Sequence, residues 1–440
     1  MTTAAENDIL TRVGPDTVMG NFLRQFWIPA CMSSELELGG DPMRLMLLGE
    51  KLIAFRDATG RVGIFDHRCP HRCASLFFGR NEGDGLRCVY HGWKFDAEGN
   101  CLEMPNLPED QRFESKVKAP AYRTMERAGL VYVYMGARAE TPPFPEIEAT
   151  MCAPEHAQTV LTQRSCNWLQ ALEGDIDTSH SGFLHSGNIS ADDLDPTQIS
   201  RFSVKHKSPR ILVQEMPYGA MYTAARPADP GYQYHRMAHF IMPFWVAYPQ
   251  TDMSQNISAN AWVPIDDENT MIFNIGDKRA TGVGRGMRFK DGTPVPGIAR
   301  PLEYLPRTTD WQGRWRPKMN GSNDFGLDRE AQRTWSFSGI NGIPLQDQMI
   351  QESMGPVIDR AREVLAGSDR MIVLTRRLIL EAAKDYAESG KLPGILDDPT
   401  LCRDARGGDL VCPETMNWLD AYKDKIDRLK GRIPGQHAAE

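Results

Sequence analysis

Short apolar runs separated by turn residues dominate the first third of the chain. Residues 43–66 contain MRLMLLGEKLIAFRD, two apolar runs across a Gly-Glu turn, and RVGIFD follows after a second turn. Residues 127–136, RAGLVYVYMG, form another run, and the proline-rich TPPFPEI behind it is typical of a linker. Runs of this length between turns are typical of β-strands. The pattern therefore predicts a small all-β domain over residues 41–145.

The pattern changes after this linker. Three further apolar stretches predict the strands of a large antiparallel sheet: 211–225, 234–249 and 257–277. Residues 345–388 have the apolar spacing of helices, and AYKDKIDRLKGR near the end predicts a solvated helix. Residues 278–340 are irregular and too long for an ordinary connection, so we interpret them as a functional or interface insertion.

Composition narrows the range of functions. A chain of 440 residues exceeds one ordinary core, so we expect an α+β protein whose second domain spans residues 146–440. A formal net charge of -8 gives no electrostatic footprint for nucleic acid or anionic membrane. The sequence has no secretory signal pattern and no apolar run of about eighteen residues, which predicts a soluble cytoplasmic protein. Nine cysteines in that compartment should stay reduced, so a cluster of them indicates metal binding or catalysis.

Such a cluster occurs in residues 66–96, DHRCPHRCASLFFGRNEGDGLRCVYHGWKFD. Cys69 stands with His71 in one hairpin-like loop, and Cys88 stands with His91 in the next. Zinc accepts two cysteines and two histidines, but structural zinc sites usually take one ligand type from each loop. A Rieske [2Fe-2S] cluster takes one cysteine and one histidine from each loop, with the cysteines on one iron and the histidines on the other. The mixed pairs therefore favour the Rieske cluster over zinc.

A second candidate ligand pattern is NWLQALEGDIDTSHSGFLH, residues 167–185. Asp177 and His180 are three residues apart, so they would share a face of a helix. His180 and His185 are five apart, and on a regular helix their side chains would diverge by roughly 140°. Convergence on one metal requires the helix to bend or end between them, and Gly182 is placed to allow this. Two histidines alone leave an ordinary pair near a helix end as the alternative.

Both patterns resemble those of the Rieske aromatic-ring-hydroxylating oxygenases. CPHR and YHGWKFD carry the likeness in the first domain, and WVPIDDENT, REAQRTWSFSGINGIPLQDQMIQESMGPVIDR and GSDRMIVLTRRL extend it to about residue 390. The likeness is strongest to the phthalate dioxygenase branch. It implies an oxygenase α-subunit in which residues 1–40 form a helical segment packed on a catalytic domain of helix-grip fold.

The resemblance also implies two cofactors per chain. One is the Rieske [2Fe-2S] cluster, held by Cys69, His71, Cys88 and His91. The other is a mononuclear Fe(II), held in a 2-His-1-carboxylate site by His180, His185 and Asp347. Helical spacing alone would leave Asp347, in PLQDQMIQES with Glu352 nearby, as an ordinary first-turn acid.

Asp177 has a different role in this resemblance. A carboxylate bonded to a metal-bound histidine fixes the tautomer and orientation of that ring. In this family the equivalent aspartate also bridges to a Rieske histidine of the neighbouring subunit, here His91 or His71. We therefore expect Asp177 to be catalytically important without being a ligand.

Cys73 helps to define the type of cluster. Rieske proteins of respiratory complexes carry an extra cysteine in each cluster loop, and the two form a disulfide. The first loop here contains Cys73, whereas CVYHGW in the second offers no partner. This favours the dioxygenase type, of lower potential. Cys73 itself is predicted to be a small buried residue.

The resemblance implies partners as well. Electrons would come from NADH through a separate reductase that carries a flavin and a plant-type [2Fe-2S] ferredoxin, and the absence of a GxGxxG unit agrees with a separate reductase. The long path between the two domains of one chain favours a homotrimer or stacked trimers.

The substrate is expected to be a small aromatic acid that reacts with O2. Candidate contacts are Ser179, Lys207 and Arg236, with Arg210 as a further source of charge on the predicted sheet. The stretch FIMPFWVAYP, residues 240–249, lacks the basic residue expected of a phthalate site, so a chlorobenzoate, phenoxybenzoate or methoxylated biaryl acid is as plausible.

Three functions follow from these observations. The first is a terminal oxygenase that hydroxylates an aromatic carboxylate by cis-dihydroxylation of a phthalate-type or substituted benzoate ring. Its alternative within the same chemistry is an aryl-ether O-demethylase. A non-catalytic Rieske electron-transfer protein and a zinc-binding interaction module are less favoured, because neither explains the HxxxxH pattern or the large second domain.

Overall fold

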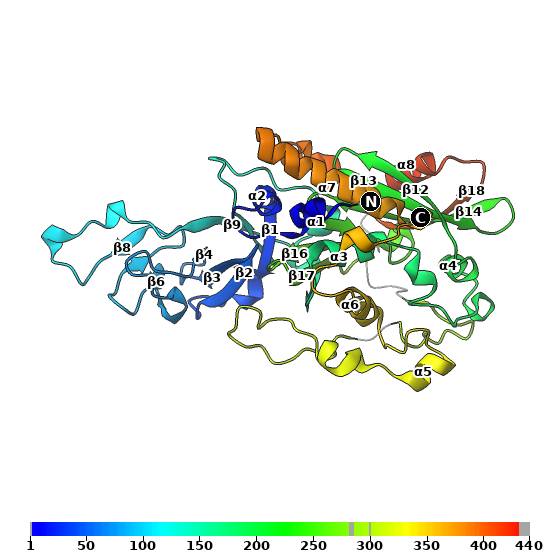
Figure 1. The fold of residues 1–440 in the computed structure, drawn as a ribbon, viewed down its shortest axis with the longest axis horizontal. Coiled ribbons are helices and arrows are strands. Elements are labelled where there is room, and N and C mark those ends of the chain that lie inside the picture. Colours follow the sequence, from blue (N-terminus) through cyan, green and yellow to red (C-terminus); the bar gives the residue numbers. More distant parts are fainter. Residues whose placement is uncertain (1, 281–285, 299–300, 431–440) are drawn as a thin grey trace, which may run out of the picture.

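The structure, a computed structural model, describes residues 2–280, 286–298 and 301–430. Figure 1 shows an elongated chain with two small sheets toward one end and a large sheet at the other. Parts of the predicted insertion, residues 281–285 and 299–300, lie outside the described residues. So do the end of the predicted terminal helix and the last residues of the second domain, 431–440.

The first domain contains both small sheets. A six-stranded sheet has the order β1-β10-β9-β4-β3-β2, with the bounds β1 Trp27–Met32, β2 Met43–Leu47, β3 Glu50–Arg56, β4 Val62–Asp66, β9 Ala121–Arg127 and β10 Leu130–Tyr134. A four-stranded sheet is inserted between β4 and β9: β5 Arg80–Glu82, β6 Gly85–Arg87, β7 Lys94–Phe95 and β8 Cys101–Glu103. The all-β prediction for this domain is confirmed.

The second domain is built on an eight-stranded antiparallel sheet of order β11-β17-β16-β15-β14-β13-β12, and β18 pairs with β14. The strands are β11 Ala157–Arg164, β12 Arg210–Met216, β13 Gly219–Pro227, β14 Tyr232–Ile241, β15 Trp245–Ala247, β16 Ser258–Pro264, β17 Thr270–Asp277 and β18 Gly408–Pro413. The predicted large antiparallel sheet is therefore confirmed. Its central strands are buried almost throughout, so continuous apolar stretches between turns made them recognisable from sequence.

Helices cover both faces of the large sheet. The α-helices of the described residues are α1 Ala4–Thr11, α2 Val18–Leu23, α3 Trp168–Ile176, α4 Arg201–Lys205, α5 Arg329–Thr334, α6 Ile343–Ser353, α7 Arg370–Ser389 and α8 Trp418–Leu429. On one face Leu374 and Ile379 of α7 share a core with Tyr222 of β13. On the other face Met221, the preceding residue of β13, packs with Tyr422 of α8. Successive strand residues thus point to opposite cores.

Two helix predictions need correction. The helical spacing predicted for residues 345–388 corresponds to α6 and α7, but residues 354–369 between them are not α-helical, and Gly355, with a φ of 90°, and Pro356 follow the end of α6. The terminal helix is not simply solvated, since α8 buries Ala421, Tyr422 and Ile426. Its charged residues conceal this apolar face.

Residues 1–40 connect the two halves of the chain. Helices α1 and α2 contact α7 of the second domain, whereas β1 pairs with β10 of the first. The segment is therefore helical only in its first part. We propose that residues 41–145 and 146–440 are the two functional domains and that residues 1–40 join them. No helix in the described part of the chain is long and apolar enough to span a bilayer.

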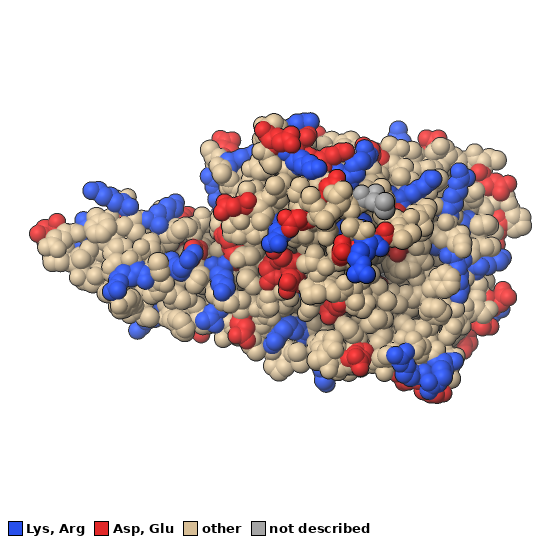
Figure 2. Space-filling view, viewed as in Figure 1, with Lys and Arg blue, Asp and Glu red and all other residues tan. Residues whose placement is uncertain are grey.

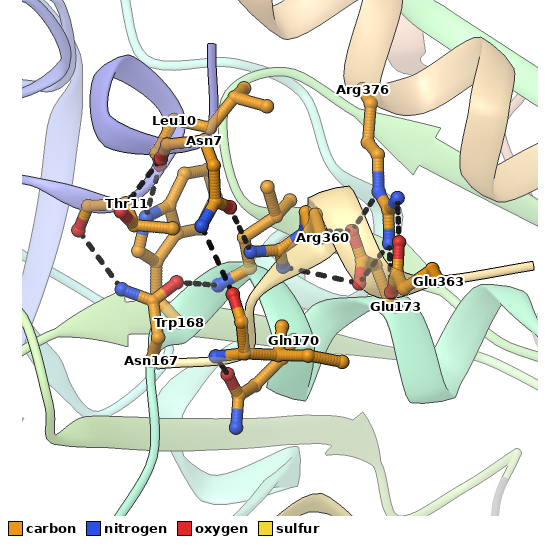
Figure 3. Close-up of polar contacts among 12 residues, drawn as sticks. Asn7, Leu10, Thr11, Asn167, Trp168, Gln170, Glu173, Arg360, Glu363 and Arg376 are labelled. Carbon is orange, nitrogen blue, oxygen red and sulfur yellow. Dashed lines mark hydrogen bonds and ion pairs between the residues drawn. The ribbon is translucent and has the colours of Figure 1, made fainter. Parts of the chain in front are cut away.

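Buried polar contacts fix α3, the helix that forms the first part of the 167–185 pattern (Figure 3). The carboxylate of Glu173 lies between Arg376, with an N–O distance of 2.6 Å, and Arg360, with an N–O distance of 3.2 Å. Arg360 also donates to Asn7 of α1 at 2.9 Å. Glu173 is only 7% exposed, so its charge depends on these arginines.

Replacing Glu173 by glutamine should lower the free energy of unfolding by about 3–5 kcal/mol, because the buried guanidinium of Arg360 loses its carboxylate and Arg376 keeps only Glu363. Urea unfolding followed by tryptophan fluorescence measures this change. Glu330→Gln is the matched control, since Glu330 pairs with Arg333 on the surface, where removal should cost less than about 1 kcal/mol. Equal unfolding midpoints for the two variants would contradict the assigned role of Glu173.

Candidate functional site

The two cysteine-histidine loops of the first domain share one turn geometry. The amide of Cys73 donates to the carbonyl of Cys69 at 2.8 Å, and the amide of Gly92 donates to the carbonyl of Cys88 at 2.9 Å. The fourth residue after each cysteine has a positive φ, 58° at Cys73 and 79° at Gly92. Each loop therefore closes tightly behind its cysteine.

This geometry corrects the prediction for Cys73. Its side chain is exposed instead of buried, because it occupies the left-handed position that glycine fills in the second loop. Cys73 is a free cysteine.

The loops bring like ligands together across the gap between them. A hydrogen bond with Cys69 lowers the pKa of the Cys88 thiol to about 6, so the two sulfur atoms are neighbours. The rings of His71 and His91 have centroids 4.4 Å apart. Each loop thus contributes one cysteine to a sulfur pair and one histidine to a nitrogen pair.

These pairs fit a two-iron cluster and not a single ion. Among the described residues, His180, His185 and Asp347 form a group of three candidate ligands whose atoms all lie within 4.8 Å of one another. None of the four loop residues belongs to this group. The Nδ1 atom of His71 is buried and has no hydrogen-bond partner. Trp93 stacks on this ring at 4.4 Å, which fixes its orientation. A ring held with an unused nitrogen is suited to ligate a metal, so the loops fit the Rieske cluster.

The second pattern folds differently from the expected helix. Helix α3 ends at Ile176, Asp177 has the extended angles φ -93° and ψ 108°, and a short 3-10 turn spans His180–Gly182. Asp177 and His180 therefore do not share an α-helical face. The α-helix already ends before His180, and the 3-10 turn that carries His180 ends at Gly182, between the two histidines as predicted. Gly182 also allows a close approach, since a Cβ there would lie 3.3 Å from Lys207.

This irregular segment brings both histidines against Asp347 of α6. The Nε2 atoms of His180 and His185 are 3.1 Å apart, and they lie 3.5 Å and 3.3 Å from Oδ1 of Asp347. Three donor atoms at nearly equal separations, from two imidazoles and one carboxylate, fit one ferrous ion. The carboxylate of Glu352, which accepts from the amide of Ser165 at 2.9 Å, is engaged elsewhere.

Two side chains behind the histidines fix their tautomers. Oδ2 of Asp177 lies 3.4 Å from Nδ1 of His180, and Oε1 of Gln346 lies 2.7 Å from Nδ1 of His185. Each acceptor favours a proton on Nδ1 and leaves the Nε2 lone pair for a metal. Sequence reasoning missed Gln346. Its only signal is the general need of a ligand histidine for an acceptor.

The electrostatics of the group favour a cation. Burial acts to lower the pKa of His180, but the hydrogen bond to Asp177 and the charge of Asp347 outweigh it, and the pKa is raised. Burial acts to raise the pKa of Asp347, yet the neighbouring His185 and His180 lower it to about 2. Asp347 is therefore ionised at neutral pH and attracts positive charge to the gap between the histidines.

Asp175 is a second carboxyl that the sequence did not single out. It accepts from Nδ2 of Asn260 at 2.6 Å and from Nε1 of Trp262 at 2.8 Å, so β16 holds it in place. Burial and the charge of Asp347 raise its pKa to about 6. Its partners are distant in sequence, and only the fold reveals them.

The predicted substrate contacts are engaged within the protein. The hydroxyl of Ser179 donates to Asp177 at 2.7 Å, and Nζ of Lys207 donates to the carbonyl of Gly187 at 2.6 Å. Lys207 lies in the loop between α4 and β12 rather than on a strand. Arg236 on β14 pairs with the buried Asp409 at 3.2 Å, and Arg210 at the start of β12 is exposed. The structure brings none of these cations into the group formed by His180, His185 and Asp347.

The chain matches two family descriptions that together cover most of its length. Residues 26–122 match the Rieske [2Fe-2S] domain. Residues 133–429 match the family described as LigXa C-terminal domain like. The first contains both cluster loops, and the second contains the 2-His-1-carboxylate group.

Several characterised proteins are similar over nearly the whole chain. The 3-chlorobenzoate-3,4-dioxygenase oxygenase subunit of Comamonas testosteroni is 45% identical, over 98% of this chain and 100% of that protein. The phthalate 4,5-dioxygenase oxygenase subunit of Pseudomonas putida is 38% identical, over 87% and 86%. The 5,5'-dehydrodivanillate O-demethylase oxygenase subunit of a Sphingobium species is 31% identical, over 91% and 85%.

A solved structure shares the fold at lower identity. NdmA of Pseudomonas putida CBB5, solved with caffeine, superposes with a TM-score of 0.55 at 19% identity, over 90% of this chain and 98% of that one. The family matches, the relatives and the geometry of both ligand sets agree. The chain belongs to the Rieske non-heme iron aromatic-ring-hydroxylating oxygenases, as an oxygenase subunit similar to the phthalate dioxygenase branch.

Proposed function

We propose that this oxygenase subunit hydroxylates a small aromatic carboxylate, with a substituted benzoate as the preferred class. The observation that supports the proposal most is that one chain contains both the group of His180, His185 and Asp347 and the two cysteine-histidine loops of a Rieske domain. The 45% identity to a 3-chlorobenzoate dioxygenase subunit, over 98% of this chain and all of that protein, supports a benzoate over a larger acid.

The ligand residues have distinct tasks in this reaction. When bound, the cluster supplies single electrons and the mononuclear iron provides positions for O2 and substrate. Gln346 and Asp177 keep His185 and His180 in the tautomer whose Nε2 faces the metal. Asp347 adds the negative charge that balances part of the charge of the ion.

The assembly and partners follow from the layout of the chain. Figure 1 shows β6, which directly precedes Cys88 of the second cluster loop, in the left part of the molecule, whereas α3 and α6 lie near its middle. We propose a homotrimer or stacked trimers in which Asp177 links His180 to His91 or His71 of a neighbouring subunit. As an oxygenase subunit the chain works with a separate reductase, which we propose to be NADH-dependent with a flavin and a [2Fe-2S] centre.

We also propose that the enzyme acts in the cytoplasm. All nine cysteines are free, including the buried Cys31, Cys166 and Cys402, as expected in a reducing compartment.

The alternative reaction is O-demethylation of a methoxylated aromatic or biaryl acid. The 31% identity to a dehydrodivanillate O-demethylase subunit favours it as the second candidate. The same ligand set serves both reactions, and they differ in which carbon of the substrate lies nearest the iron.

Turnover of a substrate panel distinguishes these reactions. Purified oxygenase with a plant-type reductase and NADH would be given benzoate, 3-chlorobenzoate, phthalate and a methoxylated biaryl acid, with products identified by mass spectrometry. We expect cis-dihydrodiols from the benzoates. Formaldehyde with a phenol as the main products would instead select the demethylase, and failure to oxidise any acid of the panel would exclude this class of carboxylate substrate.

A further inference from the structure

Two neighbouring strands of the large sheet present polar side chains on one face. In the antiparallel pair β13·β14, Arg226 lies opposite Tyr234 and Ala224 lies opposite Arg236. Tyr222 is on the same face, because it is two residues before Ala224. Three successive residue pairs that point to this face therefore carry two arginines and two tyrosines.

The polar face is connected to the segment that carries the iron ligands. Nε of Arg226 donates to the carbonyl of His206 at 2.8 Å. The next residue, Lys207, packs against Gly182, which is two residues after His180. Arg236 is also close enough for its charge to act on the pKa of His180. This face is therefore linked through His206 and Lys207 to the segment that carries His180.

The arginines on this face outnumber the acids. Asp409 of β18 forms an ion pair with Nη1 of Arg236, and Nη2 of Arg236 donates to the carbonyl of Pro249 at 2.6 Å. Arg226 is only 2% exposed, yet no acid in the described part of the chain forms an ion pair with it. Its hydrogen bonds go to two carbonyl groups, and its Nη2 atom has no acceptor.

Neighbouring hydroxyl groups are unpaired in the same way. The hydroxyls of Tyr222 and Tyr234 and Oγ1 of Thr178 are buried and have no hydrogen-bond partner. A buried donor without an acceptor costs roughly 1–3 kcal/mol, more when it is charged. A carboxylate has two acceptor oxygens and would suit Nη2 of Arg226 and the hydroxyl of Tyr234, which lie opposite each other on β13 and β14, whereas an apolar ligand would leave both unpaired.

We propose that Nη2 of Arg226, assisted by the hydroxyl of Tyr234, binds the carboxylate of the aromatic acid and so places its ring toward His180, His185 and Asp347. This assignment rests on the proposed function and identifies the residue that selects acids over neutral arenes. Arg226 takes the role that the sequence had suggested for Arg236, because Asp409 already neutralises Arg236.

The test compares an acid with its neutral analogue in the iron-loaded enzyme. Arg226→Met removes the charge and keeps an apolar side chain of similar reach. We expect the Kd and KM for 3-chlorobenzoate to rise about 10- to 100-fold, since hydrogen bonds to a charged group are lost. The Kd for 3-chlorobenzamide, measured by calorimetry, should change less than about 2-fold. Arg210→Met is the matched control, because Arg210 is an exposed arginine at the start of the adjacent strand β12.

A purely structural role of Arg226 would give other results. It would lower the melting temperature and weaken both ligands equally, or leave both unchanged, and either outcome overturns the assignment. Arg226→Lys keeps the charge but loses the planar fork, so it should raise the acid Kd by about 3-fold or more without affecting the amide. This variant decides the question if Arg226→Met does not fold. Failure of the wild-type enzyme to bind any aromatic acid would refute the proposed function itself, whereas an unchanged acid Kd in Arg226→Met refutes only the role of Arg226.

Discussion

Replacing His185 by alanine is expected to abolish product formation while the Rieske cluster remains. Wild-type enzyme should contain about three irons and two acid-labile sulfides per chain, from one [2Fe-2S] cluster and one mononuclear site. The variant should contain about two of each. The reason is geometric: Nε2 of His185 lies 3.1 Å from that of His180 and 3.3 Å from Asp347, so its loss leaves two of three ligands.

Iron and sulfide analysis, the visible spectrum and single-turnover product formation measure this effect. His156→Ala is the control, because His156 is a half-buried histidine at the end of a 3-10 turn, outside both ligand sets. A variant that loses labile sulfide together with iron would show that His185 supports the fold generally. Product formation at the wild-type rate in iron-replete His185→Ala would refute the ligand assignment.

The parts of this molecule that local sequence determines were predictable. The strands β2 to β4 follow short apolar runs between turns, alternating in β2 and continuous in β3 and β4, and these runs are visible without any tertiary information. The cluster loops could be predicted equally well, because the cysteine and the histidine of each loop are only two or three residues apart in the sequence. Asp347 was different. It lies far along the chain from His185, and only resemblance to a family selected it.

Features that depend on tertiary contacts were missed or misjudged. Helical spacing placed Asp177 on a helix, but α3 ends one residue earlier, where the chain turns toward the metal site. Cys73 was expected inside because cysteine is usually buried, yet the turn requires a positive φ there and exposes it. Nothing in the sequence singled out Gln346 or Arg226. Gln346 is selected by its contact with His185, and Arg226 is selected because its Nη2 atom has no acceptor.

Replacing Asp177 by asparagine is expected to slow product formation by about 100-fold or more with both metal centres still occupied. The carboxylate accepts from the amide and hydroxyl of Ser179 at 2.8 Å and 2.7 Å, which positions it toward Nδ1 of His180. Asparagine keeps this size and reach but removes the negative charge that stabilises imidazole partners. A loss of iron from Asp177→Asn would show instead that the residue is needed to hold the metal. Ser181→Ala is the control for the segment, because its hydroxyl donates to the carbonyl of Thr178 at 2.8 Å.

A mixed assembly tests whether Asp177 acts across a subunit boundary. Asp177→Asn chains keep an intact cluster, and His91→Ala chains keep an intact Asp177 beside His180. Each parent should be nearly inactive. If Asp177 of one subunit joins His180 to the cluster histidine of the next, a hybrid ring contains interfaces in which both groups are intact, and part of the activity should return. The measurement is single-turnover product per mononuclear iron in both parents and in hybrids whose composition is verified by native mass spectrometry. No recovery in a verified hybrid would confine Asp177 to fixing the tautomer of His180 within its own chain, because each parent defect would then persist in every subunit.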